Sequence, residues 1–425
     1  MKRLADFLLR KVAVLTAVVV IALAIGIGSW SRGSLRAAWN MIHIPANAQP
    51  FSDASSIPSA IEVVLIGLDP YRVNPVDPLH RLFNYPPIWL DLRYLGIRSQ
   101  NSNLLGLLFA VAAVCGYLFL FNTRTFLTIA IVFLALISNG VLFGIERGNS
   151  DQFVFFLLVV GFFLLFRQRV EVRARWTSLL LVCLTVLKIY PFAAVTVFLQ
   201  QRRGWLRASL TAVAAIAALV LTCGRRLPLV IANTPLDTDL SFGSFPFFSA
   251  IGSHFMHPLV PWIAKHHAAA PLAAILLGGT GLLVGALAGN RLQRILPPLN
   301  AGQVRGAIAI ACLSIFCLAF VAGSSYDYRL IYLTGGLAWL IEDLDTGLSK
   351  RSLPAALLIL LLLWKPFWLS ITGELLDGAV FLMSSLWLGS ALTFRSNVRD
   401  ELSGAAFFQA AQKNTSLAPS AHETR

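Results

Sequence analysis

Charged residues are scarce in this sequence, and their scarcity excludes an ordinary water-soluble domain. Only 13% of the 425 residues are charged and 57% are hydrophobic, whereas roughly a quarter of the residues in a soluble domain are charged. The excess apolar surface is therefore expected to face lipid. Apolar segments of about 20 residues recur along the chain, which is the length that a helix needs to cross a bilayer.

Cysteine pairs, phosphate-binding glycine loops and solenoid repeats are also lacking. The five cysteines form no Cys-x-x-Cys pair and have no histidine at metal-ligand spacing, so we expect free, buried thiols. No glycine-rich loop of the dinucleotide or Walker type is present. The net charge of +14 forms no basic patch, because the basic residues separate the hydrophobic runs. We therefore expect no nucleic-acid partner.

The hydrophobic runs predict an all-α, polytopic transmembrane helical bundle with about 11–12 membrane segments. The segments are expected at about 12–30, 103–121, 125–145, 152–167, 177–187 with 190–200, 206–224, 271–289, 306–323, 330–341, 354–370 and 375–394. The first run follows four basic residues and has no obvious cleavage site, so we expect an uncleaved anchor.

Basic residues in the short loops predict the orientation, because cytoplasmic loops carry an excess of arginine and lysine. One face collects Arg124, Arg167, Arg169, Arg173, Arg175, Arg202, Arg203, Arg207, Arg291, Arg294, Arg305, Lys350 and Arg351. We expect this face, both termini and a disordered tail over 395–425 to be cytoplasmic. The protein is accordingly predicted to be a multi-pass protein of the cell (inner) membrane, with two long loops, 31–102 and 225–270, on the outer side.

The stretch 177–200 cannot be a single crossing, because basic clusters flank it on both sides. Lys188 lies at its centre, followed closely by Pro191, which removes a backbone donor and breaks a helix. We predict a hairpin of two half-helices with the lysine at its outward apex. Broken helices at membrane depth are tolerated where they are buried in protein or line a wet cavity.

The two long loops are predicted to hold helices that do not cross the membrane. An amphipathic helix is expected near 56–67, and the run 85–97 is too short and too charged to span, so it should lie in the interface. The second loop contains Arg225, Arg226, Asp237, Asp239, His254, His257, His266 and His267. The spacing of its histidines is not that of a zinc site, so solvated or interfacial roles are expected.

Acidic residues near the membrane core are costly and usually functional. Four of them fall near outer helix ends, together with two cations: Asp53, Glu146, Asp151, Asp327, Lys188 and Arg329. Carboxylates can act as general bases, and cations can neutralise a phosphate leaving group. Three of the four acidic residues also have a structural interpretation. Asp53 could be a helix cap, Glu146 could form an ordinary ion pair with Arg147, and Asp151 could favour a helix dipole.

The order of these motifs resembles a known family. Asp53 lies in PFSDAS, early in the first long loop, and GLDPYRVNP, FNYPPIWLDLRYLGI, the acidic turn ERGNSDQF and LKIYP follow it. This order resembles the GT-C superfamily of membrane glycosyltransferases, and most of all glycosyltransferase family 87, the polyprenol-phosphate-mannose-dependent α-mannosyltransferase group. The likeness covers roughly residues 1–200, with SSYDYRLIYL as a later match. It implies a catalytic module over 1–200 and a second transmembrane module over 201–394.

The resemblance implies roles for individual residues. Asp53 matches the general base, Asp151 and Glu146 a second acidic site, and Lys188 and Arg329 the donor-phosphate site. Further residues are expected to line the cavity, namely Tyr190, Tyr326, Asp327, Tyr328 and Arg147. If one shared site exists, Asp53, Asp151, Lys188 and Arg329 should converge on one cavity.

The implied function is transfer of a hexose, such as mannose, from a polyprenyl-phosphate donor to a lipid-linked or polysaccharide acceptor, by inverting single displacement. The donor is a substrate, no cofactor is expected, and no metal is expected to be required, with a divalent ion left open. The alternatives are a transporter or flippase of a lipid-linked saccharide, which also uses broken helices, and a scaffold subunit of a polysaccharide-export complex.

Overall fold

The computed structural model of the chain describes residues 2–201, 204–235, 239–255, 269–346, 350–367 and 370–393. These residues are mostly helical. The first half contains α1 (Lys2–Arg32), α2 (Leu35–Met41), α3 (Ser52–Leu65), η1 (Pro87–Leu95), η2 (Ser99–Asn101), α4 (Ser102–Leu120), α5 (Phe126–Leu136), α6 (Asn139–Arg147), α7 (Ser150–Leu165), α8 (Val170–Leu187) and η3 (Tyr190–Phe198). The second half contains α9 (Gly204–Cys223), η4 (Gly224–Arg226), α10 (Leu227–Ala232), β1 (Ser241–Phe242), α11 (Ser244–Phe255), α13 (Ala269–Leu287), α14 (Gly289–Leu292), α15 (Val304–Val321), β2 (Ser325–Tyr326), η5 (Asp327–Tyr332), α16 (Leu333–Asp345), α17 (Leu353–Leu363) and α18 (Ile371–Thr393).

Within the described residues, six helices are long and apolar enough to cross a membrane, which indicates a multi-pass membrane protein. They span Leu8–Arg32, Ser99–Leu120, Gly204–Ala232, Ala269–Leu287, Val304–Val321 and Ile371–Thr393. The pair α5 and α6 is bent by 45° and gives a seventh candidate. These are fewer than the 11–12 segments expected. Helices α7 and α17 are shorter apolar helices, the hairpin predicted at 177–187 and 190–200 is the end of α8 and the 3-10 helix η3, and the segment predicted at 330–341 divides into η5 and α16.

The chain breaks at Lys188, where the sequence predicted it. Helix α8 ends at Leu187, Lys188 is extended with φ −149° and ψ 140°, and the 3-10 helix η3 follows with Pro191 in its first turn. The freed carbonyl of Leu187 accepts a hydrogen bond from Trp89 Nε1 of η1 at 2.9 Å. The first long loop therefore docks on the break.

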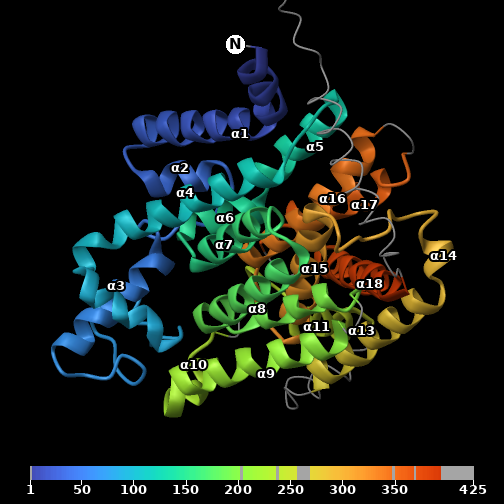
Figure 1. The fold of residues 1–425 in the computed structure, drawn as a ribbon. Helices are drawn as coiled ribbons and strands as arrows, with labels where there is room; N and C mark the ends of the chain where they lie inside the picture. The colour runs from blue at the N-terminus through green and yellow to red at the C-terminus, as the bar shows by residue number, and fades with distance from the viewer. Residues whose placement is uncertain are drawn as a thin grey trace, which may run out of the picture.

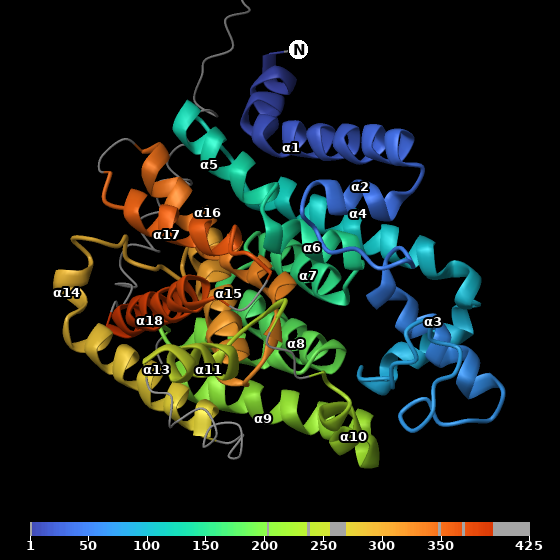
Figure 2. The same ribbon diagram turned by 180° about the vertical axis from the view of Figure 1, so that it is seen from behind.

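The first loop differs from its prediction in two respects. The helix predicted near 56–67 is α3, but it begins at Ser52 and ends at Leu65, and ten of its fourteen residues are buried. The segment η1 is a 3-10 helix. Both views of the ribbon place α3 at the opposite side of the molecule from α14, α13 and α18 (Figures 1 and 2).

Helix α15 forms the centre of the core, and most of its residues are buried. Helices α13 and α18 approach closely through glycines, as is common between membrane helices. A Cβ atom at Gly285 would lie only 2.1 Å from the carbonyl oxygen of Leu386. Strands β1 and β2 pair antiparallel, with Ser241 opposite Tyr326. This pairing attaches the second long loop to the segment before η5. The tail 395–425, Asp237, His257, His266 and His267 lie outside the described residues.

Candidate functional site

A tight turn between α6 and α7 sets the geometry of the site. Gly148 ends α6 in the left-handed region, with φ 57°, and a Cβ atom there would lie 2.9 Å from Gly106 Cα, so the turn requires glycine. Asn149 then caps α7, because its side-chain oxygen accepts a hydrogen bond from the Asp151 N–H at 2.9 Å. The turn thus places Arg147 at the end of one helix and Asp151 in the first turn of the next.

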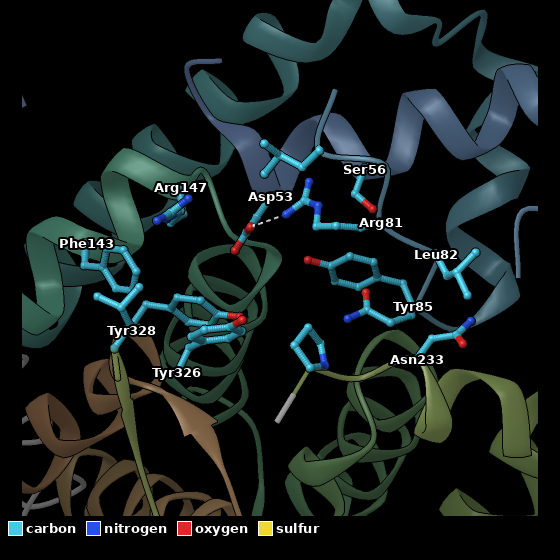
Figure 3. A pocket seen from close by; sticks show the side chains of 14 residues that line it. Asp53, Ser56, Arg81, Leu82, Tyr85, Phe143, Arg147, Asn233, Tyr326 and Tyr328 are labelled. Atoms are coloured by element: carbon cyan, nitrogen blue, oxygen red, sulfur yellow. Dashed lines mark hydrogen bonds and ion pairs between the residues drawn. The ribbon is translucent and has the colours of Figure 1, made fainter. Parts of the chain in front are cut away.

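Asp53 lies in the first turn of α3, and it does not cap the helix. The N-cap is Phe51, a residue in the left-handed region at φ 51°, and no side chain makes a capping hydrogen bond there. The Asp53 carboxylate instead pairs with Arg81 Nη1 at 3.0 Å and accepts a hydrogen bond from Asn149 Nδ2 at 2.7 Å. Both of its oxygens are therefore held in a fixed direction, facing a cavity (Figure 3).

Arg81 is a site residue that the sequence analysis missed. Its guanidinium bridges Asp53 and Asp77, which lies 3.1 Å away and is buried. An aspartate four residues before an arginine in a polar loop is a common local pair, so the sequence carries no signal that the same arginine reaches Asp53, 28 residues away.

The cavity beside Asp53 has a volume of about 150 Å³. Tyr326 and Tyr328 lie on one side of the space below the carboxylate and Tyr85 lies on the other (Figure 3). Arg81 and Arg147 complete its polar wall. Burial raises the pKa of Tyr85 above its usual value, so its phenol stays neutral and can donate a hydrogen bond.

Lys188 and Arg329 converge on Asp151. The distances to Asp151 Oδ2 are 3.6 Å from Lys188 Nζ and 3.5 Å from Arg329 Nε, and the aspartate side chain is fully buried. The two cations also stack on aromatic rings, Lys188 over Tyr85 at 4.4 Å and Arg329 over Tyr190 at 5.0 Å. Formal charges leave this group with an excess of one positive charge. The excess positive charge can attract an anion, while the buried Asp151 carboxylate stays paired with the two cations.

A larger cavity, of about 480 Å³, lies against the two cations. Its polar lining includes Lys188, Arg329, Tyr190 and Ser325, and its apolar lining comes from η3, α10 and the end of α15: Phe192, Val230, Ile231, Ala232, Leu318, Ala319 and Ala322. A cavity with cations and an extended apolar wall suits an anion that carries a hydrocarbon chain.

The two cavities adjoin, because five residues line both of them: Asn84, Tyr85, Pro235, Tyr326 and Tyr328. Asp53, Lys188 and Arg329 therefore border one composite space. Asp151 lines neither cavity and lies behind the two cations that it holds. Four further residues named from the sequence line these cavities, namely Tyr190, Tyr326, Tyr328 and Arg147.

Two predicted site residues face elsewhere. Glu146 is buried, pairs with Arg147 Nε at 3.2 Å and accepts a hydrogen bond from the Asn47 N–H at 3.3 Å, so it is an ion-pair partner and not part of the cavity lining. Asp327 lies between Tyr326 and Tyr328, but its carboxylate points toward Lys365 at 3.8 Å. Tyr326 ends β2 and Tyr328 lies in the first turn of η5, and both line the cavity, whereas the Asp327 side chain between them does not.

Lys365 belongs to a second buried polar cluster that the sequence analysis missed. Its Nζ contacts Asp377 Oδ2 at 2.6 Å and Glu374 Oε1 at 2.8 Å, besides Asp327. A usable signal was present, because two acidic residues three positions apart within the apolar helix α18 require a cation nearby.

No family model, curated protein or solved structure matches the chain. Among the residues that the structure describes, no group of three or more His, Cys, Asp or Glu side chains could hold a metal ion.

Proposed function

We propose that the chain is an integral-membrane glycosyltransferase of GT-C type. It moves a hexose, such as mannose, from a polyprenyl-phosphate donor to a lipid-linked or polysaccharide acceptor at the extracytoplasmic face of the membrane. The observation that carries the proposal is the junction of two cavities, one beside an oriented carboxylate and the other beside two cations and an apolar wall.

The larger cavity supports the donor part of the proposal. The donor phosphate would lie against Lys188 and Arg329, whose excess positive charge is fixed in place by Asp151. The prenyl chain would run along the apolar wall formed by Phe192, Val230 and neighbouring residues. A lipid-linked donor also suits a reaction on the outer side, where nucleotide sugars are not supplied.

The smaller cavity supports the acceptor part. Asp53 would accept the proton from the acceptor hydroxyl while the hydroxyl oxygen forms a bond to the anomeric carbon. The bond between that carbon and the phosphate oxygen breaks, and its electron pair leaves with the polyprenyl phosphate. Lys188 and Arg329 would stabilise the charge that develops on the leaving oxygen. Attack from the face opposite the phosphate inverts the anomeric configuration.

The test is a transfer assay with the purified full-length chain in detergent. Radiolabelled polyprenyl-phosphate mannose or glucose is incubated with an envelope glycolipid and polysaccharide extract, and the matching nucleotide sugars serve as controls. We expect label to leave at least one polyprenyl phosphate and none of the nucleotide sugars. If the intact donor only crosses the membrane of reconstituted vesicles, the chain is a transporter and the proposal is wrong.

The proposed orientation predicts which surface residues can be labelled from outside intact cells. Arg72 is exposed in the first long loop, with its side chain 75% accessible, and Lys350 is exposed between α16 and α17. We expect Arg72→Cys to react with a membrane-impermeant maleimide and Lys350→Cys to react only after permeabilisation. Labelling of the wild-type chain, which has five cysteines, gives the background. The opposite pattern would invert the topology.

A further inference from the structure

Lys365 follows helix α17 and is one of the most buried cations among the described residues, with its side chain only 2% exposed. Its ammonium group donates hydrogen bonds to Asp377 Oδ2 at 2.6 Å and to the carbonyl oxygen of Ser241 at 2.8 Å. It also pairs with Glu374 Oε1 at 2.8 Å and with Asp327 Oδ1 at 3.8 Å. One side chain therefore connects α17, α18, β1 and η5.

Backbone contacts extend the same junction. The Asp327 N–H donates to the Leu240 carbonyl oxygen at 2.9 Å, and the Leu240 N–H donates to the Phe367 carbonyl oxygen at 2.8 Å. Asn139, the first residue of α6, donates from Nδ2 to the Lys365 carbonyl oxygen at 3.1 Å. The start of η5 is thus held by backbone and side-chain contacts to Leu240 and Lys365.

The residues beside Asp327 line the proposed substrate cavities. Tyr326 and Tyr328 line both cavities, and Arg329 lines the donor cavity and pairs with Asp151. A shift of Asp327 would move all three. Displacements of about 1 Å at a positioned group can cost about 100-fold in rate.

We infer that Lys365 is a positioning residue which, through Asp327, fixes the turn that presents Tyr328 and Arg329 to the substrate cavities. The inference rests on the proposed function. Stability alone does not account for the cluster, because one cation shared by three buried carboxylates is costly to desolvate, and apolar side chains of similar size often stabilise a protein at least as well. The ion pairs instead fix the orientation of the Asp327 side chain and of the turn that contains it.

The first test variant is Asp327→Asn, which removes the charge that Lys365 holds and keeps the shape of the side chain. Its donor KM and kcat are measured with the polyprenyl-phosphate hexose that the wild type uses, together with its melting temperature in detergent. We expect the donor KM to rise about 10-fold in the folded enzyme. A purely structural role would lower the yield or the melting temperature and leave KM unchanged.

Two control variants separate positioning from a general loss of charge. Asp343→Asn makes the same substitution in an ion pair at the other end of α16, where Asp343 Oδ1 lies 3.0 Å from Arg351 Nη2. Asp327→Glu keeps the carboxylate and can still reach Lys365. Both should keep the donor KM within about 3-fold of wild type. An equal rise of KM in Asp343→Asn would overturn the inference, as would a wild-type KM in folded Asp327→Asn.

If Asp327→Asn does not fold, the same link can be cut from the other side. In the double variant Lys365→Met/Asp377→Asn, one positive and one negative charge are removed together, so the net charge of the cluster is unchanged. The same rise of KM supports the inference, and a wild-type KM overturns it. If the wild-type protein transfers no sugar, the proposed function is wrong. The inference about Lys365 is then wrong as well, because it rests on that function.

Discussion

Replacing Asp53 by asparagine is expected to lower the rate of hexose transfer about 1,000-fold while leaving the protein folded. Removal of a general base typically costs between 10² and 10⁴ in rate. Asp53 is the carboxylate that lines the smaller cavity, where we propose that the acceptor binds. The asparagine side chain has the same shape and can still accept a hydrogen bond from Arg81, so the loss should come from the missing proton acceptor. The measurement is the initial rate of transfer from the polyprenyl-phosphate hexose, with the melting temperature recorded in parallel.

The matched control is Asp77→Asn. Asp77 pairs with the same arginine, Arg81, at 3.1 Å, but it does not line the smaller cavity. Its Oδ1 accepts hydrogen bonds from two backbone N–H groups, those of Leu79 and Arg81, and an asparagine can keep these. Less than a 10-fold loss is expected. If Asp77→Asn and Asp53→Asn lose activity equally, the essential group is the arginine and not the general base.

Much of the fold could be predicted from the sequence, because lipid-facing helices need long apolar runs. The break at Lys188 was predictable because Pro191 and the flanking basic residues both oppose a single crossing. The number of long helices was not, because hydropathy alone cannot tell a full crossing from a short buried helix such as α7 or α17. Both helices are apolar, and only their packing against other helices decides whether such a run crosses the membrane or forms a short buried helix.

Individual site residues were predicted where one side chain combined charge with an apolar setting. Lys188 and Arg329 met that condition, and the structure brings both onto Asp151. Asp327 met it too, but the direction of its side chain depends on where the 3-10 helix η5 begins, which the hydropathy pattern does not show. Arg81 did not meet it, because it lies in a polar loop. Contacts between residues far apart in the chain, such as Arg81 with Asp53, follow from tertiary packing and leave no local pattern.

The second large prediction concerns Lys188 and Arg329 at the larger cavity, together with Asp151 between them. Removal of a positive charge and removal of the negative charge should change the affinity for polyprenyl phosphate in opposite directions. Lys188→Met leaves Arg329 paired with Asp151, so the group loses its excess positive charge. Transfer should fall about 100-fold, the usual effect of losing one group that stabilises developing negative charge. The inhibition constant of polyprenyl phosphate, the leaving group, should rise at least 10-fold. In the wild type, Lys188 and Arg329 together attract the phosphate, and charges attract each other more strongly where little water screens them.

Asp151→Asn should raise the affinity for polyprenyl phosphate, whereas turnover should fall as it does in Lys188→Met. Lys188 and Arg329 then keep their charges without the carboxylate between them, so polyprenyl phosphate should bind several-fold more tightly. The cations lose the partner that directs them, and product release slows, so turnover should still fall. The double variant Lys188→Met/Asp151→Asn restores an excess of one positive charge on Arg329 and should regain part of the lost affinity. If Lys188→Met alone binds polyprenyl phosphate as tightly as wild type does, the cations do not hold the donor phosphate.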